Sequence, residues 1–359
     1  GDKKYLKLAE DFSQHALLKP LAANEDILTG MHANTQIPKF IGFERISQLE
    51  EAKNYHDAAS NFFDNVTTQR SISIGGNSVR EHFNPVDDFS SVVSSEQGPE
   101  SCNTYNMLKL SKLLFEDTSE EHYIDFYERG LYNHILSSQN PDGGFVYFTP
   151  IRPGHYRVYS QPETSFWCCV GSGMENHTKY NELIYAKKED KLYVNLFIPS
   201  EVNWEEKNAT LTQKTNFPEE ATTELIWNSK KKTKATLMLR YPQWVNAGEL
   251  KVYVNDKLEK IDATPGSYVS LERKWKNGDR IKMELPMHLS LEELPVGKYY
   301  LIYEDDYAKS YTTIKKEFKG LDIVKDESKT IFKPNYRVEN DIVMISFTNP
   351  KEVKTTTRV

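Results

Sequence analysis

Apolar residues recur every three or four positions through the first half of the chain, which is the spacing of one face of an α-helix. Pro99 and Glu100 lie just ahead of one such stretch, where residues of a first helical turn are expected. The pattern predicts helices over residues 5–12, 46–66, 107–115 and 121–136, and the end of a further helix over 181–185.

The spacing of apolar residues changes to two near residue 190, which is typical of β-strands. Asn255–Asp256 and Asn277–Gly278 are expected to form turns. Short strands separated by turns favour a β-sandwich. We therefore predict an α+β, multidomain fold, with a helical domain over residues 1–189 and an antiparallel β-sandwich over 190–359. The predicted strands cover residues 192–198, 234–241, 250–254 and 281–285, and surface loops are expected at 304–307 and 325–329.

Composition limits the choice of partners. A hydrophobic content of 38% in 359 residues supports a real core, and the net charge of −7 argues against nucleic acids and anionic membranes as partners. No apolar run approaches the ~20 residues of a membrane span. The 21 Tyr, 17 Phe and 5 Trp residues suit a sugar-binding protein, but a large β-rich core uses the same residues. No signal peptide is visible and the chain starts without Met, so the compartment stays open between a bacterial periplasm and cytoplasm.

The three cysteines are too few, and odd in number, for a disulfide scaffold. Cys168 and Cys169 are adjacent, and Cys102 follows Glu100 by two residues. One carboxylate and three thiolates make a four-ligand set for a tetrahedral, thiophilic metal ion, with zinc as the first choice. Three buried, inert cysteines or a purely structural zinc are the alternatives, because the spacing is not that of a zinc finger.

Glycines accompany two of the candidate stretches. Gly171 and Gly173 are expected to form a turn that lets the neighbouring cysteines share one ion. Glu81 follows the glycine loop at 75–76, as a catalytic carboxylate often does, although a lone glutamate is commonly just solvated. Neither glycine stretch has the context of a phosphate-binding loop.

A third stretch, residues 31–39, collects His, Asn, Thr and Gln in a short loop before a helix. Such groups hydrogen-bond well to sugar hydroxyls. A capped helix start with a structural histidine at His32 explains the same residues.

Together these stretches resemble glycoside hydrolase family 127, the β-L-arabinofuranosidases, and the related family 146. The resemblance rests on 28–39, on 75–83, on Glu100-Ser101-Cys102 and on 168–173, and it extends from residue 1 to about 290. It implies Glu100, Cys102, Cys168 and Cys169 as zinc ligands, Cys168 as the nucleophile, Glu81 as the general acid/base, and His32 and Tyr147 as substrate-binding residues.

The resemblance also implies a retaining glycoside hydrolase that acts on β-L-arabinofuranosides or related plant-polysaccharide sugars. It implies a helical (α/α)6 barrel of about twelve helices, whereas the sequence predicts about six before the strands begin. We therefore expect a second copy of the chain, or a missing N-terminal half, to cover the incomplete ring. A non-catalytic carbohydrate-binding or structural protein is the alternative, and a Cys–His hydrolase using His177 is a third.

Overall fold

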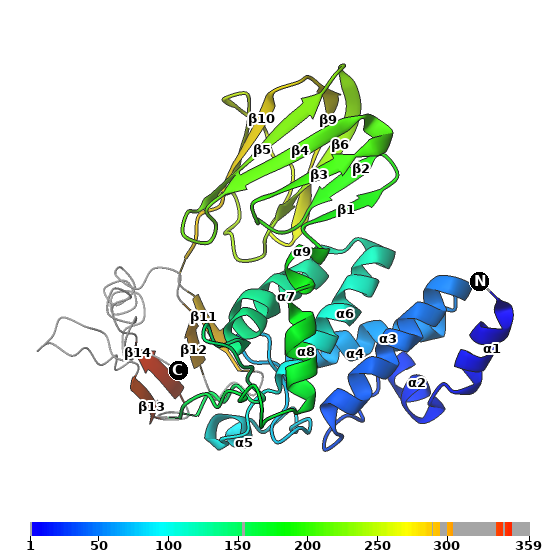
Figure 1. The fold of residues 1–359 in the computed structure, drawn as a ribbon, viewed down its shortest axis with the longest axis vertical. Coiled ribbons are helices and arrows are strands. Elements are labelled where there is room, and N and C mark those ends of the chain that lie inside the picture. The colour runs from blue at the N-terminus through cyan, green and yellow to red at the C-terminus, as the bar shows by residue number, and fades with distance from the viewer. Residues whose placement is uncertain are drawn as a thin grey trace, which may run out of the picture. The chain divides into compact units, whose positions relative to one another are not determined.

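The computed structural model describes residues 2–152, 155–288, 290–294, 300–303, 335–339 and 342–346, which form helices and β-sheets (Figure 1). These residues divide into two compact units. The first unit contains residues 2–117, Arg129–His177 and the described residues from 290 onward, and the second contains Thr118–Glu128 and Thr178–His288. The domain boundary expected after residue 189 stays a prediction.

The first unit is mainly helical. Helix α4 packs against both α2 and α3, and the rings of Phe40 and Phe62 stack with centroids 3.8 Å apart between α3 and α4. The α-helices of this unit are α1 (Lys3–Asp11), α2 (His15–Ala22), α3 (Ala33–Glu50), α4 (Lys53–Gln69), α5 (Ser90–Ser94), α6 (Ser101–Thr118) and α8 (Cys168–Asn176). Within the described residues, no helix has the length and apolar character needed to cross a membrane.

Two of the predicted helices differ from those observed. The stretch predicted as one helix over 46–66 is divided between α3 and α4, because Glu51 adopts a left-handed backbone with φ of 55° and ends α3. The helix predicted over 121–136 starts as α7 (Glu121–Gly130), but it continues as a π-helix over Leu131–Ile135 and a 3-10 helix over Leu136–Ser138. The predicted helix end at 181–185 corresponds to α9 (Lys179–Glu182), and residue 185 already belongs to a strand.

The second unit contains two sheets that face each other (Figure 1). One has the order β1-β2-β6-β9 and the other β3-β4-β5-β10-β7-β8. Side chains from both sheets, including Leu237 and Trp227, share one buried core, so this unit is a β-sandwich. The strands are β1 (Tyr185–Lys188), β2 (Lys191–Val194), β3 (Ser200–Trp204), β4 (Ala209–Thr215), β5 (Thr222–Ser229), β6 (Thr233–Tyr241), β7 (Lys251–Val254), β8 (Lys257–Leu258), β9 (Ser267–Trp275) and β10 (Asp279–Glu284).

The predicted strands are present as β2, β6, β7 and β10, although β2 ends at Val194 rather than at residue 198. The sheets are not purely antiparallel, since β2 and β6 run parallel. The turn predicted at Asn255–Asp256 joins β7 to β8, and both of its residues have positive φ. Strands β11 (Ser290–Glu293), β12 (Tyr300–Tyr303), β13 (Asn335–Glu339) and β14 (Ile342–Ser346) follow, and the loops predicted at 304–307 and 325–329 lie outside the described residues.

A buried ionic cluster joins α7 to β6 inside the second unit. The guanidinium of Arg240 is fully buried and contacts three carboxylates of α7, those of Glu121, Asp125 and Glu128. Burial raises the pKa of Glu121 to about 7, although Arg240 opposes this shift. One cation therefore faces three acidic groups in a desolvated place, which makes this cluster sensitive to pH.

Candidate active site

The starts of two helices carry all three cysteines. Cys168 and Cys169 are the first two residues of α8, and Cys102 is the second residue of α6, directly after Glu100 and Ser101. Unpaired N–H groups and the helix dipole favour negative charge at such positions. The helix starts therefore suit a set of thiolates and a carboxylate.

The glycine turn expected at 171–173 was a wrong prediction, because both glycines lie inside α8. Gly173 is required for packing, since a Cβ at this position would collide with the ring of Phe145. The sulfurs of the adjacent cysteines lie close together because both residues begin a helix, where neighbouring side chains can converge on one point beyond the helix end.

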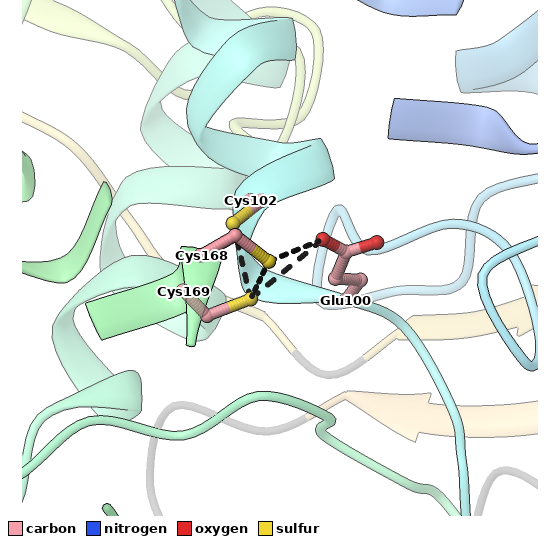
Figure 2. Close-up of side chains that lie close together, drawn as sticks. All are labelled: Glu100, Cys102, Cys168 and Cys169. Carbon is pink, nitrogen blue, oxygen red and sulfur yellow. Dashed lines mark hydrogen bonds between the residues drawn. The ribbon is translucent and has the colours of Figure 1, made fainter. Parts of the chain in front are cut away.

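The four predicted ligand side chains lie together (Figure 2). The Cys168 and Cys169 sulfurs are 3.9 Å apart, and each lies 3.7–3.8 Å from Oε1 of Glu100. The Cys102 and Cys169 sulfurs are 3.0 Å apart, which is too far for a disulfide bond, and all three thiols are free. All four ligand atoms lie within 4.8 Å of one another.

Close contact between four acidic groups shifts the pKa values in this cluster. Burial and the neighbouring Cys169 raise the pKa of Glu100 to about 8. The Cys102 thiol donates a hydrogen bond that lowers the pKa of Cys169 to about 7, and this same bond raises the pKa of Cys102. No Lys or Arg pairs with any of the four groups among the described residues. Four acidic groups thus gather without a protein cation.

The donor set fits a tetrahedral, thiophilic metal ion. Metal–sulfur bonds of about 2.3 Å in tetrahedral geometry place neighbouring sulfurs about 3.7 Å apart. The Cys168 and Cys169 sulfurs, 3.9 Å apart, are close to this spacing, and the Cys102 and Cys169 sulfurs, 3.0 Å apart, are closer together than it requires. The second oxygen of Glu100, Oε2, is buried and has no hydrogen-bond partner among the described residues. A bound cation would give this carboxylate the partner that it lacks.

Tyr147 connects the predicted acid/base to the predicted nucleophile. Its hydroxyl donates a hydrogen bond to Oε1 of Glu81, and the Cys168 thiol lies 3.6 Å from the same hydroxyl oxygen. Burial and the bond to Glu81 raise the pKa of Tyr147, so this hydroxyl keeps its proton. His32 lies on the other side of Glu81, with Nε2 3.7 Å from Oε2. All the site residues predicted from the sequence therefore lie in one place.

The cysteines differ in access to solvent. Cys168 is exposed, whereas Cys169 is fully buried and Cys102 is 3% exposed. Burial raises the pKa of the Cys168 thiol, so Cys168 needs an external source of positive charge to stay ionised.

Glu81 is held by a strained backbone. Ser78, Arg80 and Glu81 all have positive φ, at 76°, 48° and 68°, although none is glycine. Such conformations are costly and concentrate at functional sites. The amide of Ala33 donates to the Glu81 carbonyl at 2.8 Å, and the Asn103 side chain donates to the Ser78 hydroxyl at 2.8 Å.

The glycines before Glu81 are packed rather than flexible. Gly75 and Gly76 are both buried, and a Cβ on Gly76 would lie 2.6 Å from Pro99. They bring the Glu81 loop close to the residues that lead into α6.

His32 combines the two roles considered from the sequence. It is the N-cap of α3, where Nδ1 accepts a hydrogen bond from the Thr35 amide, so the stretch from Ala33 onward is helix and not loop. His177, the histidine of the Cys–His alternative, lies at the far end of α8. His177 comes nine positions after Cys168, or about 13 Å along the helix axis, so it does not reach the thiol.

Two further residues support the cluster and were not singled out from the sequence. The side-chain amide of Asn34 donates to Oε1 of Glu100 at 3.3 Å, and the amide of Asn106 donates to Asn34 at 2.8 Å. The Ser172 hydroxyl lies 3.1 Å from the Cys102 sulfur. Asn34 and Ser172 both belong to stretches that carried the resemblance, but neither an asparagine nor a serine predicts by its type alone a contact with a metal ligand.

A search of the curated proteins found no match. A solved GH127 β-L-arabinofuranosidase from Geobacillus stearothermophilus T6 is similar, with a TM-score of 0.64 and 20% identity over 78% of this chain and 47% of that one. A second structure, a GH127 β-arabinofuranosidase, has a TM-score of 0.69 and 23% identity over 84% of this chain and 52% of that one. A third structure, a glycoside hydrolase, has a TM-score of 0.70 and 16% identity over 99% of this chain and 67% of that one.

These likenesses show the fold, and they confirm the expected α+β, multidomain architecture. The chain spans about half the length of the first two of these proteins. Residues 1–182 match the GH127 catalytic domain of β-L-arabinofuranosidases, and residues 191–287 match the GH127 middle domain. Because the first match alone covers half of the 359 residues, the chain belongs to the GH127 β-L-arabinofuranosidase family.

Proposed function

We propose that this chain carries the site of a retaining glycoside hydrolase that cleaves β-L-arabinofuranosides or related plant-polysaccharide sugars. The observation that carries the proposal is that Glu81 and Cys168 both contact the hydroxyl group of Tyr147. An acid/base and a nucleophile next to each other are what a two-step displacement needs. Family membership supports the substrate class.

Cys168 is the nucleophile in this proposal because it is the exposed member of the pair, while Cys102 and Cys169 are buried. Cys102, Cys169, Glu100 and Cys168 are the ligands of the metal, for which we propose zinc on the basis of three sulfurs and one carboxylate. A bound zinc ion would supply the positive charge that keeps these thiols ionised.

In the first step the Cys168 sulfur attacks the anomeric carbon, and the bond from that carbon to the leaving oxygen breaks. Protonated Glu81 donates its proton to the leaving oxygen, and the sugar is then bound to Cys168 as a thioglycoside. In the second step Glu81 takes a proton from water, the water oxygen attacks the same carbon, and Cys168 leaves as thiolate. Two inversions give overall retention of configuration.

Tyr147 and His32 orient Glu81 from two sides in this scheme, and both lie where they can contact the sugar. Since Tyr147 keeps its proton, its hydroxyl can donate to Glu81 when this group is a carboxylate. When Glu81 is protonated, the hydroxyl can turn to a sugar oxygen. The proposal therefore assigns His32 and Tyr147 to substrate binding as well as to the positioning of Glu81.

The test is turnover of an aryl β-L-arabinofuranoside, with the anomer of the first-formed product followed by NMR. We expect retention in the wild type, no turnover in Cys168→Ala, and turnover unaffected by Glu163→Gln, a change in an exposed residue five positions before Cys168. Sugar binding without turnover would favour the non-catalytic carbohydrate-binding alternative, and inversion would contradict the role of Cys168.

A further inference from the structure

A second group of metal-ligating side chains lies in the helical unit, apart from the cysteine cluster. Glu44 comes from α3, His56 from α4 and Asp117 from the end of α6. Nδ1 of His56 lies 3.0 Å from Oε2 and 3.3 Å from Oε1 of Glu44, and 3.4 Å from Oδ2 of Asp117. Three helices thus bring two carboxylates and one imidazole nitrogen to a single point.

A single ring nitrogen of His56 faces both carboxylates in this arrangement. Three carboxylate oxygens surround one ring nitrogen, which carries at most one hydrogen and can serve only one of them well. Glu44 is fully buried, and burial raises its pKa, so ionisation of this carboxylate is costly without a strong positive partner. His56 is the only basic side chain that pairs with Glu44 among the described residues.

The same arrangement suits a metal ion. Bonds of about 2.0–2.2 Å from nitrogen and oxygen ligands place neighbouring ligand atoms about 3.0–3.5 Å apart. The distances of 3.0 Å and 3.4 Å from His56 Nδ1 to Glu44 and Asp117 fall in this range. The side chain of Asp117 is 44% exposed and that of His56 23%, so water can reach the open side and complete the coordination.

We propose that Glu44, His56 and Asp117 form a second metal site, which binds a divalent ion of the zinc class through one nitrogen and two carboxylate ligands. Two carboxylates and a neutral imidazole carry a charge of −2, which a divalent cation neutralises. The site differs from the cysteine cluster in having no sulfur, so it binds a harder set of ions and binds zinc less tightly than three thiolates do. It links α3, α4 and α6, of which α3 begins after His32 and α6 carries Cys102.

The experiment uses the full chain, first saturated with Zn²⁺ and dialysed so that the cysteine cluster keeps its ion. Isothermal titration with Zn²⁺ at pH 7.5 should then find one further equivalent per chain, and this equivalent should raise the Tm. In His56→Gln and in Asp117→Asn the further equivalent should bind at least about 100-fold more weakly, because a direct ligand is worth more than an outer-shell contact. Elemental analysis after dialysis checks that each variant still holds the ion of the cysteine cluster.

The matched control is Asp57→Asn. Asp57 is the residue after His56 in α4, it pairs with Lys53, and it is not part of the group. The Asp57→Asn variant should bind the further equivalent of Zn²⁺ as tightly as the wild type does. If His56→Gln fails to fold, the Asp117→Asn variant tests the proposal, because the half-exposed Asp117 side chain can be replaced with little effect on folding. The proposal is overturned if the wild type takes up no further equivalent, or if both ligand variants bind it as tightly as the wild type does.

Discussion

The stability of the β-sandwich unit should depend on pH through Glu121. This carboxyl is 4% exposed, and its pKa is raised from 4.5 to about 7 because burial outweighs the attraction of Arg240. Below pH 4.5 the group is protonated in both the folded and the unfolded chain and has no effect. As the pH rises from 4.5 to 7, the unfolded chain releases the proton first, so the free energy of unfolding falls. A shift of about 2.5 units at 1.36 kcal/mol each gives a loss of about 3 kcal/mol.

The perturbation is Glu121→Gln, which removes the titration while keeping an oxygen that can accept from Arg240 Nε. The free energy of unfolding of the variant, minus that of the wild type, should therefore be about 2.5 kcal/mol larger at pH 8 than at pH 5. Urea unfolding at each pH gives this difference. Tryptophan fluorescence is a suitable probe, because Trp204, Trp227, Trp244 and Trp275 all lie in the unit that contains Glu121.

Glu272→Gln is the matched control. Glu272 lies on β9 of the same unit, but its side chain is 57% exposed and pairs with Lys234 on the surface. The free energy of unfolding of Glu272→Gln, minus that of the wild type, should change by no more than about 0.5 kcal/mol between pH 5 and pH 8. If the free energy of unfolding of Glu121→Gln differs from that of the wild type by the same amount at pH 5 and at pH 8, the reasoning is refuted. Glu121 would then ionise at its ordinary pKa.

Four further predictions concern the site and the assembly. Protein purified without added metal should contain near-stoichiometric zinc by elemental analysis, and Cys102→Ser or Cys169→Ser should lower both metal content and Tm. Iodoacetamide should label the exposed Cys168 before the buried Cys169, and a bound substrate should protect it, as peptide mass analysis would reveal. Glu81→Gln should lose ~100- to 10,000-fold in rate on substrates with poor leaving groups and much less on activated aryl glycosides; equal small losses on both would make Glu81 a bystander. Tyr5, Leu8, Phe12 and Leu49 are at least half-exposed, so light scattering should find a second copy or another polypeptide on this face; a compact monomer that binds no hydrophobic dye would contradict this.

The helices and strands were predictable wherever apolar spacing was regular. Residues 107–115 predicted the centre of α6, and 234–241 predicted β6 almost to its ends. The break at Glu51 was not predictable, because a glutamate with positive φ carries no local signal and the apolar spacing runs on from α3 into α4. The parallel pairing of β2 with β6 was also hidden, since strand direction depends on the path of the chain rather than on side-chain alternation.

For the site, the residue types could be predicted but not the means by which they are held. Three cysteines and a glutamate predict a donor set from chemistry alone, and the structure brings these four together. The positive φ of Ser78, Arg80 and Glu81 could not be predicted, because the sequence places its glycines at 75 and 76 rather than at the strained positions. Asn34 was equally hidden, since its contact with Glu100 joins residues 66 positions apart.

The adjacent cysteines are best understood from the geometry of a helix start. Successive residues of a helix are rotated by about 100° around its axis, so two neighbours cannot point in the same direction, but near the first turn both can approach one point beyond the helix end. Here the two sulfurs lie 3.9 Å apart, yet Cys168 is exposed and Cys169 is fully buried. A longer spacing, such as one turn, would stack both side chains on one face and give them similar access to solvent. In the proposed mechanism this adjacency would separate two tasks: Cys169 would hold the ion from within the fold, while Cys168 would share the charge of that ion and still be exposed to a substrate.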